Sequence, residues 1–441
     1  MTTQLRSQRI PPLRKICNSK TSACRLDALV AYIVLATMTG CAGAYADSGA
    51  VADDPHTPLL LLSGFGTLGV VHSSEEDADF TSSIFKPNGA GHTHTWSTDV
   101  DSNIAGQVVA NVTPQLSGMV QVISQQRYDG SYRPYVEWAN IKYQLTSDFS
   151  VRVGRIVLPS FLFSDTRNIG YANAWVRPPV EVYGLVPVAN SDGVDASYRF
   201  QIGEVIQTVL GTYGKTMSQT PQGGAAEARR QWIICDTVEY GALTAHIAYQ
   251  EAHLTVDSLN TFFDAFRSFG QQGVAIADEF DQHNKPLSFI GLGAIYSPGK
   301  WFMAGEWGTS EFHSALGKRT AWYVSGGYRF GKLTPYLNYA VTIADGPGSD
   351  PGLNTAALSP QLAGRAFGLN AGLNAILGLS PAQNTTSLGV RWDLAEKMDI
   401  KLQYDRTRLD EGSAGTFINL QPGFQPGSAV NLFSAVFDFV L

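Results

Sequence analysis

The sequence predicts an all-β fold: a transmembrane, up-and-down antiparallel β-barrel of about 16 strands. Three observations lead to this prediction. Many segments of about ten residues alternate between apolar and polar positions. The connections between them alternate between short and long. Only 16% of the residues are charged, yet no run of 18 apolar residues after residue 47 would span a membrane as a helix.

The first 46 residues have the features of a secretory signal peptide. Six basic residues precede an apolar run at 28–39, and Ala44 and Ala46 are the small residues of an A-x-A cleavage site. We therefore expect a signal peptide at 1–46, a short N-terminal segment at 47–60 and the barrel at 61–441. Two alternatives stay open: lipoprotein processing at Cys41, and a basic tail on a cytosolic protein.

Removal of the signal peptide would change the charge and the cysteine content. It takes away six basic residues and one acidic residue, leaving 25 basic and 37 acidic residues and a net charge of −12. This acidity argues against a nucleic-acid partner. Three of the four cysteines are also removed, so Cys235 remains alone and no intrachain disulfide can form.

Alternating segments follow one another along the mature chain. The clearest strands are expected at residues 62–72, 99–112, 116–127, 149–155, 196–200, 320–330, 386–394, 398–404 and 431–441. Two further segments, 205–213 and 287–297, have no clear polar face. Their register is therefore not fixed by the pattern, and either of them could pack at a subunit interface.

The connections fall into two kinds. Seven are short and carry turn-forming residues: 113–115, 146–148, 201–204, 241–242, 298–300, 331–333 and 395–397. Eight are longer and irregular: 73–97, 128–133, 157–190, 215–230, 254–286, 310–319, 345–383 and 410–427. Because the two kinds alternate, all long loops of a meander lie at one end, as in barrels of the bacterial outer membrane.

The positions of charges indicate which strand face meets lipid. A Lys or Arg on the lipid face at the bilayer midplane costs roughly 2–4 kcal/mol. In 386–394, Arg391 keeps to the face opposite Leu388. Exceptions such as Glu137 and Arg155 are expected at outer strand ends, near lipid headgroups. Aromatic residues expected at strand ends on the lipid face are Tyr135, Tyr143, Trp301, Trp307 and Tyr339.

Several segments, in order and spacing, resemble the Gram-negative porins, the sixteen-stranded trimeric channels. FSVRVGR at 149–155 is similar to the porin strand before the third long loop, and ASYRF at 196–200 to the strand that follows it. SGFGTLGVVHS at 63–73 is similar to the first porin strand. The resemblance implies an outer-membrane homotrimer in contact with lipid and lipopolysaccharide.

The resemblance also implies a pore constriction. In porins the third long loop, here about 157–190, folds into the barrel, and its acidic residues face basic residues on the wall. The matching acidic residues are Asp165, Glu181 and, just after the loop, Asp192. The basic candidates are Arg127, Lys142, Arg152, Arg155, Arg329, Arg391 and Lys401. Such groups would set a transverse field that sorts solutes by charge; the alternative is that they are solvated lumen residues.

This loop departs from the family pattern. It lacks the PEF-type motif of enterobacterial porins and is instead rich in aromatic residues, with Pro178-Pro179. That departure leaves a substrate-selective channel open.

The resemblance to porins also extends to the final strand. Phe433, Phe437, Phe439 and Leu441 alternate on one face to the end of the sequence, with Asp438 on the other face. They resemble the C-terminal assembly signal that the outer-membrane barrel assembly machinery reads, although the family usually ends in Phe. The last strand would pair with the first to remove both sheet edges.

The remaining motifs are weaker indications of function. His92 and His94 form an H-x-H pair without a third ligand, so no metal and no cofactor are predicted. Apolar residues at helical spacing in 259–269 predict a short helix packed on the barrel rim, stopped at Gly270. No G-x-S-x-G or H-E-x-x-H motif supports an enzyme.

The sequence thus predicts an outer-membrane porin, a passive diffusion channel for small hydrophilic solutes and ions. A substrate-selective channel and a non-conducting surface adhesin or structural barrel are the alternatives. A barrel enzyme is the least supported of these.

Overall fold

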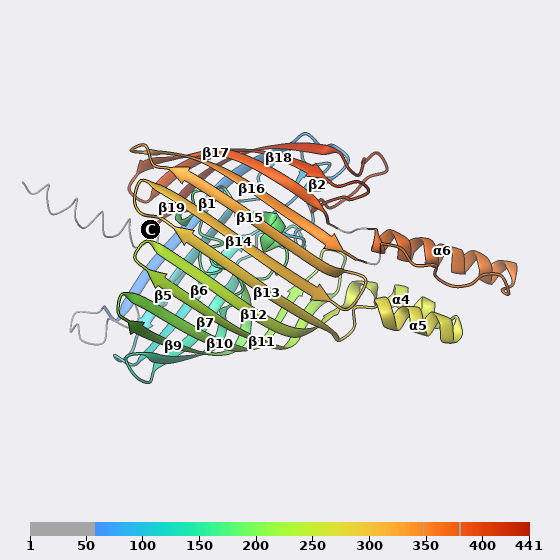
Figure 1. Ribbon diagram of the computed structural model, residues 1–441, viewed down its shortest axis with the longest axis horizontal. Helices are drawn as coiled ribbons and strands as arrows, with labels where there is room; N and C mark the ends of the chain where they lie inside the picture. The colour runs from blue at the N-terminus through green and yellow to red at the C-terminus, as the bar shows by residue number, and fades with distance from the viewer. Residues whose placement is uncertain (1–57, 347, 379–380) are drawn as a thin grey trace, which may run out of the picture.

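The computed structural model describes residues 58–346, 348–378 and 381–441. The expected signal peptide, with Ala44 and Ala46, lies outside these residues, as does Cys41. In the described chain, sixteen long strands close into one antiparallel barrel, and helices project from one end (Figure 1). The predicted fold class is confirmed.

The barrel strands follow one another in sequence order around the wall. They are β1 (Leu60–Ser73), β5 (Asn103–Asn111), β6 (Leu116–Gln125), β7 (Tyr135–Gln144), β8 (Phe149–Val157), β9 (Asn190–Ile202), β10 (Val205–Gln219), β11 (Ala225–Tyr240), β12 (Leu243–Val256), β13 (Lys285–Tyr296), β14 (Trp301–Phe312), β15 (Gly317–Tyr328), β16 (Leu333–Asp345), β17 (Gln383–Ala395), β18 (Met398–Leu409) and β19 (Ala429–Val440). Pairing of β1 with β19 closes the sheet, in a register that sets Phe65 opposite Val440. The short β4 (Trp96–Ser97) also pairs with β1, and β2 (Asp79–Phe80) pairs with β3 (Ala90–Gly91) in the first long loop.

The wall is apolar on its outer face and polar on its inner face, whereas a sheet in a soluble protein turns its apolar face inward. On β18, Met398, Leu402 and Tyr404 are exposed on the outer face, while Asp399 and Lys401 are fully buried on the inner face. Such alternation suits lipid on one side and a polar lumen on the other. None of the helices in the described residues is long and apolar enough to cross a bilayer.

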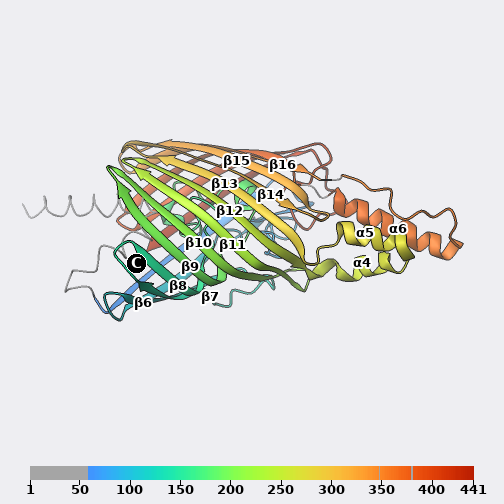
Figure 2. The same cartoon turned by 60° about the horizontal axis from the view of Figure 1, so that its bottom comes forward.

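The loop asymmetry is largely as predicted. All seven short turns lie at one end of the barrel, away from the projecting helices (Figure 2). Two of the eight long loops, however, were overestimated. The β10–β11 connection spans only 220–224 and the β14–β15 connection only 313–316, because the strand ladders continue to Gln219–Ala225 and Phe312–Gly317.

The two strands of uncertain register are fixed by what they contact inside the barrel. Leu210 on β10 is buried with Cys235 and Ala248. Phe289 on β13 packs against the loop that enters the barrel. These apolar inward positions meet side chains instead of water, although Thr208 and Thr212 also lie on the inward face of β10.

A bulge between β6 and β7 changes the expected orientation of two residues. The pairing shifts between Gln121 and Val122, so one strand gains an extra residue locally. A bulge of this kind redirects side chains. Glu137 is therefore buried at 2% exposure instead of lying near headgroups, and Tyr135 lines an inner cavity instead of the lipid face.

The second correction concerns the segment expected to be one helix on the rim. After η2 (Asp257–Leu259), it forms two helices, α4 (Asn260–Arg267) and α5 (Gly270–Phe280). They pack with α6 (Pro360–Leu377) and project beyond the barrel (Figures 1 and 2). The first helix ends at Arg267, before the predicted stop, and Gly270, with φ of 70°, begins the second helix. The apolar face meets α6 through residues such as Phe266 and Leu373, both fully buried.

Candidate functional site

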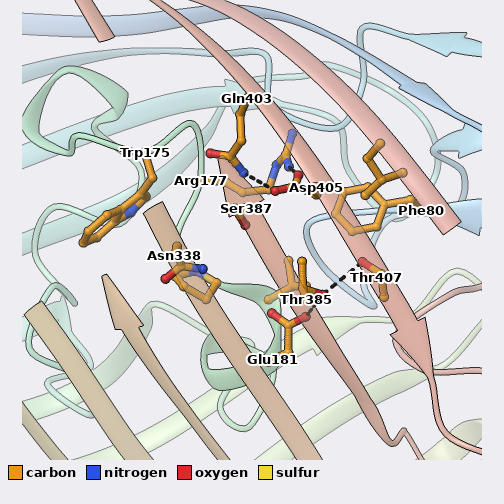
Figure 3. Close-up of a pocket in the computed structure, with 13 residues that line it drawn as sticks. Phe80, Trp175, Arg177, Glu181, Asn338, Thr385, Ser387, Gln403, Asp405 and Thr407 are labelled. Carbon is orange, nitrogen blue, oxygen red and sulfur yellow. Dashed lines mark hydrogen bonds and ion pairs between the residues drawn. The ribbon is translucent and has the colours of Figure 1, made fainter. Parts of the chain in front are cut away.

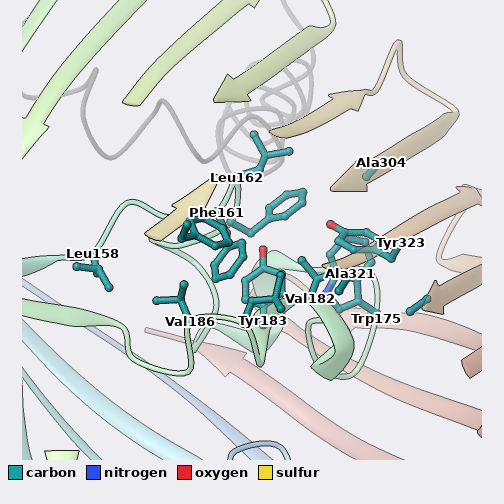
Figure 4. Close-up of a cluster of buried hydrophobic side chains, with 14 of the residues drawn as sticks. Leu158, Phe161, Leu162, Trp175, Val182, Tyr183, Val186, Ala304, Ala321 and Tyr323 are labelled. Atoms are coloured by element: carbon teal, nitrogen blue, oxygen red, sulfur yellow. The ribbon is translucent and has the colours of Figure 1, made fainter. Parts of the chain in front are cut away.

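The loop between β8 and β9, residues 158–189, lies inside the barrel. Its hydrophobic residues pack on the inner wall of β11 and β13–β16, where Phe161, Val182 and Tyr183 meet wall residues such as Tyr323 (Figure 4). Phe161 stacks on Tyr183 with ring centroids 4.5 Å apart. The aromatic content of this loop therefore holds it to one side of the lumen.

A buried carboxylate on β14 anchors the same face of the loop. Glu306 accepts hydrogen bonds from the Leu162 backbone N–H at 2.7 Å, from the Tyr183 hydroxyl at 2.7 Å and from the Tyr323 hydroxyl at 3.0 Å. Two of these donors belong to the loop and one to the wall. Since a buried carboxylate needs such partners, Glu306 ties the loop to the barrel.

The tip of the loop is held by an arginine. Arg177 donates to Asp101 at 2.6 Å and 2.8 Å, to Asp405 at 3.2 Å and to the Ser434 hydroxyl at 2.6 Å. Figure 3 shows Arg177 meeting Asp405, next to Gln403. This buried cluster joins the loop to β18, β19 and the residues just before β5.

Glu181 lies in the short helix α3 (Val180–Tyr183), buried at 3% exposure. It accepts hydrogen bonds from Gln383 and Thr385 on β17. Burial raises the pKa of Glu181, although both donors oppose this. Its partners are neutral, so Glu181 does not face a basic wall residue.

Two of the predicted basic residues hold the loop backbone. Arg391 on β17 donates to the carbonyls of Tyr171 and Asn173, and Lys401 on β18 donates to the carbonyl of Gly170 at 2.6 Å. A Cβ at Gly170 would lie 2.0 Å from the Asp438 carboxylate, so only glycine allows this approach. η1 (Gly170–Ala172) forms at this contact.

The same two cations are balanced by acids on the wall. Lys401 pairs with Asp438 at 2.8 Å, and Arg391 pairs with Asp393 at 2.7 Å and with Asp399 at 3.1 Å. These groups are therefore engaged in fixing the loop, and their charges are compensated locally.

Two of the remaining wall candidates, Arg152 and Arg155, also form ion pairs. Arg152 on β8 pairs with Asp195 at 2.6 Å, and Lys142 lies opposite Arg152 in the β7–β8 register. Arg155 pairs with Asp192 at 2.7 Å. Arg329 differs: it lies in the short turn after β15, where it donates to the carbonyl of Gly299, so it is not brought to the loop.

Asp165 lies in a second environment. It lines a small cavity of about 30 Å³ with Cys235, His246 and Thr208. Burial raises the pKa of Asp165 to about 7, although Arg152 opposes this. The carboxyl group is thus not paired across the lumen as the porin resemblance implied.

A large open space lies on the other side of the loop. A cavity of about 540 Å³ is bounded by the loop, the ends of β6 and β7, and the first long loop. Its lining includes Arg127 and Arg155, and also Lys86, Arg167 and Arg177, which the sequence did not single out. The loop thus presents basic side chains of its own to this cavity. Elsewhere it contacts carboxylates of the wall, such as Glu306 and Asp405.

The alternation of inward and outward positions along each strand could have identified some of these missed residues. Glu306 and Asp405 fall on inward positions of their strands, so their polar character was visible. Arg167 and Arg177 lie within the predicted loop, but nothing in the sequence tells which way a loop residue points. In the described residues, no group of three or more His, Cys, Asp or Glu is placed to hold a metal ion.

The residues of the expected assembly signal lie on the closing strand. Phe433 and Leu441 are exposed outside the barrel, while Phe437 and Phe439 are partly covered and lie near one another. Asp438 is fully buried on the inner face.

This architecture matches solved proteins of the bacterial outer membrane. The anion-selective porin from Comamonas acidovorans aligns with a TM-score of 0.51 and 11% identity, over 87% of this chain and 99% of that one. The outer membrane channel DcaP of Acinetobacter baumannii aligns with a TM-score of 0.52 and 11% identity, over 87% and 97%. No protein-family model and no curated protein matches the sequence.

These similarities define the fold. The chain is a sixteen-stranded barrel of the Gram-negative outer-membrane type, with the architecture of the porins. The resemblance identified from the sequence is confirmed at this level.

Proposed function

We propose that this protein is a passive diffusion channel for small hydrophilic solutes and ions in the bacterial outer membrane. The observation that carries the proposal is the cavity of about 540 Å³ that the inward loop leaves beside the polar wall. A polar lumen in a barrel of this size suits the passage of water and small solutes. The homotrimer, the lipopolysaccharide contact and recognition by the assembly machinery stay predictions.

In this proposal the inward loop sets the width of the pathway. Its apolar face packs on β13–β16, and Arg177, Arg391 and Lys401 fix its other contacts. A loop held on two sides gives a rigid constriction. Of the basic wall candidates, Arg127 and Arg155 then line the remaining path, whereas Arg152 is held in a pair with the buried Asp195.

Recording from planar bilayers tests the channel. We expect stepwise, ohmic conductance from the purified protein. Because the Leu158 N–H donates to the Ala189 carbonyl at 3.0 Å, the loop ends are adjacent, and residues 160–187 can be replaced by a short Gly-Ser linker. This variant should conduct more than the natural chain. Shortening the β14–β15 connection at 313–316, no residue of which lines the cavity, is the control.

A surface-binding barrel is the second candidate, favoured by the projecting helices α4, α5 and α6. The same recordings separate it from a channel. A protein that migrates as a folded, heat-modifiable barrel but never conducts, with or without the loop, would overturn the channel proposal.

A further inference from the structure

The cavity beside the inward loop has an unusual charge balance. Five basic side chains line it, namely Lys86, Arg127, Arg155, Arg167 and Arg177, against two acidic ones, Asp101 and Glu137. Arg155 and Arg177 are paired with carboxylates. The other three cations are Lys86, Arg127 and Arg167.

None of these three cations has a carboxylate oxygen within 4.0 Å among the described residues. The Lys86 ammonium donates to the carbonyls of Asp99 and Val100, both at 2.8 Å. Arg167 donates to the carbonyls of Val186 and Val188. Carbonyl dipoles orient a cation but do not neutralise it. Burial lowers the pKa of Lys86 to about 8 and also lowers the pKa of Arg167, so both groups stay mainly protonated at pH 7.

The third cation is held by aromatic rings. The Arg127 guanidinium lies over Tyr128 and Tyr135, with its central carbon 5.6 Å and 5.5 Å from the ring centroids. Arg167 similarly lies over Tyr183, at 5.4 Å. Stacking uses the face of a guanidinium and leaves its N–H edge for an acceptor, and carboxylate is the acceptor that matches this edge.

We infer that this cavity binds small organic carboxylates through Lys86, Arg127 and Arg167. The aromatic walls add apolar contact for the body of such a molecule, and the volume falls in the range of small-molecule sites, about 300–1,000 Å³. The effect of this site on transport rests on the proposed channel function. If the protein conducts, the pathway should favour anions at this cavity, although the expected mature chain is acidic overall. Selectivity is set where the path is narrow, not by net charge.

Reversal potentials in a KCl gradient and block by sodium benzoate test this site. The natural chain should favour chloride, and benzoate should reduce the current. The triple variant Lys86→Gln, Arg127→Gln, Arg167→Gln should lose the chloride preference and bind benzoate about tenfold more weakly or worse. Arg229→Gln is the matched control, since it removes an exposed cation of β11 outside this cavity.

The outcomes separate this inference from the proposed function. A channel that conducts but favours potassium, or a triple variant that behaves like Arg229→Gln, overturns the carboxylate site and leaves the channel in place. A protein that never conducts overturns the channel; calorimetry with benzoate on the detergent-solubilised protein then decides the site. Benzoate heat that is equal in the natural chain and the triple variant overturns it, and heat lost in the triple variant supports it.

Discussion

Arg177 is the residue on which the position of the inward loop depends most. It is buried at 8% exposure and contacts two carboxylates, Asp101 and Asp405, that are themselves buried in the lumen. Removing the cation would leave two buried negative charges side by side. Such unpaired charges are far more costly than the pair itself is stabilising.

We therefore expect Arg177→Met to destabilise the protein by roughly 3–5 kcal/mol, the cost typical of breaking a buried ion pair. Denaturant unfolding followed by tryptophan fluorescence measures this change. Arg133→Met is the control, because Arg133 pairs with Asp129 in solvent and should show no measurable effect. Equal unfolding midpoints for the two variants would contradict the assigned role.

A second residue-scale prediction concerns pH. Burial raises the pKa of Asp165 to about 7, with Arg152, Asp195, Cys235 and His246 around it. The folded state therefore holds a proton that the unfolded state has lost, and stability falls as pH rises from about 4 to about 7. Asp165→Asn cannot ionise, so it should raise the melting temperature at pH 8 and change little at pH 4. A variant with the same pH dependence as the natural chain would exclude Asp165 as the cause.

At the scale of elements, the projecting helices form a small unit with its own hydrophobic core. Leu373 of α6 is fully buried against α4 and α5, and Leu362 on the same helix is 42% exposed. The unit extends beyond the barrel, so its packing is separate from the wall (Figure 1). A substitution in this core should therefore destabilise the helices and leave the barrel folded.

Leu373→Ala should cost about 2–5 kcal/mol of packing within this unit. We expect faster protease cleavage at 257–284, measured by limited proteolysis, with unchanged heat-modifiable migration of the barrel. Leu362→Ala should resemble the natural chain. Loss of the folded barrel in Leu373→Ala would show that the helices support the wall after all.

The elements also show what the sequence could predict. Alternation along strands such as 398–404 predicted the barrel, because lipid and lumen impose opposite polarity on neighbouring residues. The bulge that buries Glu137 was not predictable, since one extra residue leaves no mark in composition. The pairing of α4 with α6 was missed because the two segments are about 100 residues apart in the sequence.

The candidate site was predicted in part for a similar reason. Parity placed Arg391 and Lys401 inside the barrel, and the porin resemblance pointed to the loop at 157–190. Their partners depend on how the loop folds, and loop residues have no periodicity from which direction can be read. Lys86 and Arg167 are the clearest examples.

At the scale of the whole molecule, stability depends on closing the sheet. Phe439 lies opposite Gly66 on β1 and Met398 on β18, so the last strand is paired on both sides. An unpaired edge in the bilayer would leave backbone groups without hydrogen bonds. The end of β19 is therefore needed by two neighbours at once.

Deleting Phe439–Leu441 should block assembly of the barrel without removing any residue of the large cavity. Heat-modifiable migration of the membrane-extracted protein measures this, and the deleted chain should lose the folded band. Leu441→Phe, which restores the usual porin ending, should assemble at least as well as the natural chain. A trimmed chain that still assembles and conducts would rule out the assembly-signal role.

The seam between β1 and β19 also sets the order of events during biosynthesis. Thr67 and Asp438 share a hydrogen bond across 371 residues of chain. Contacts this distant in sequence carry a large loop-closure entropy and form late. The ribosome must therefore release nearly the whole polypeptide before β1 can pair with β19, although β1 can pair with β5 earlier. Until this seam closes, the apolar strands need protection from aggregation during export.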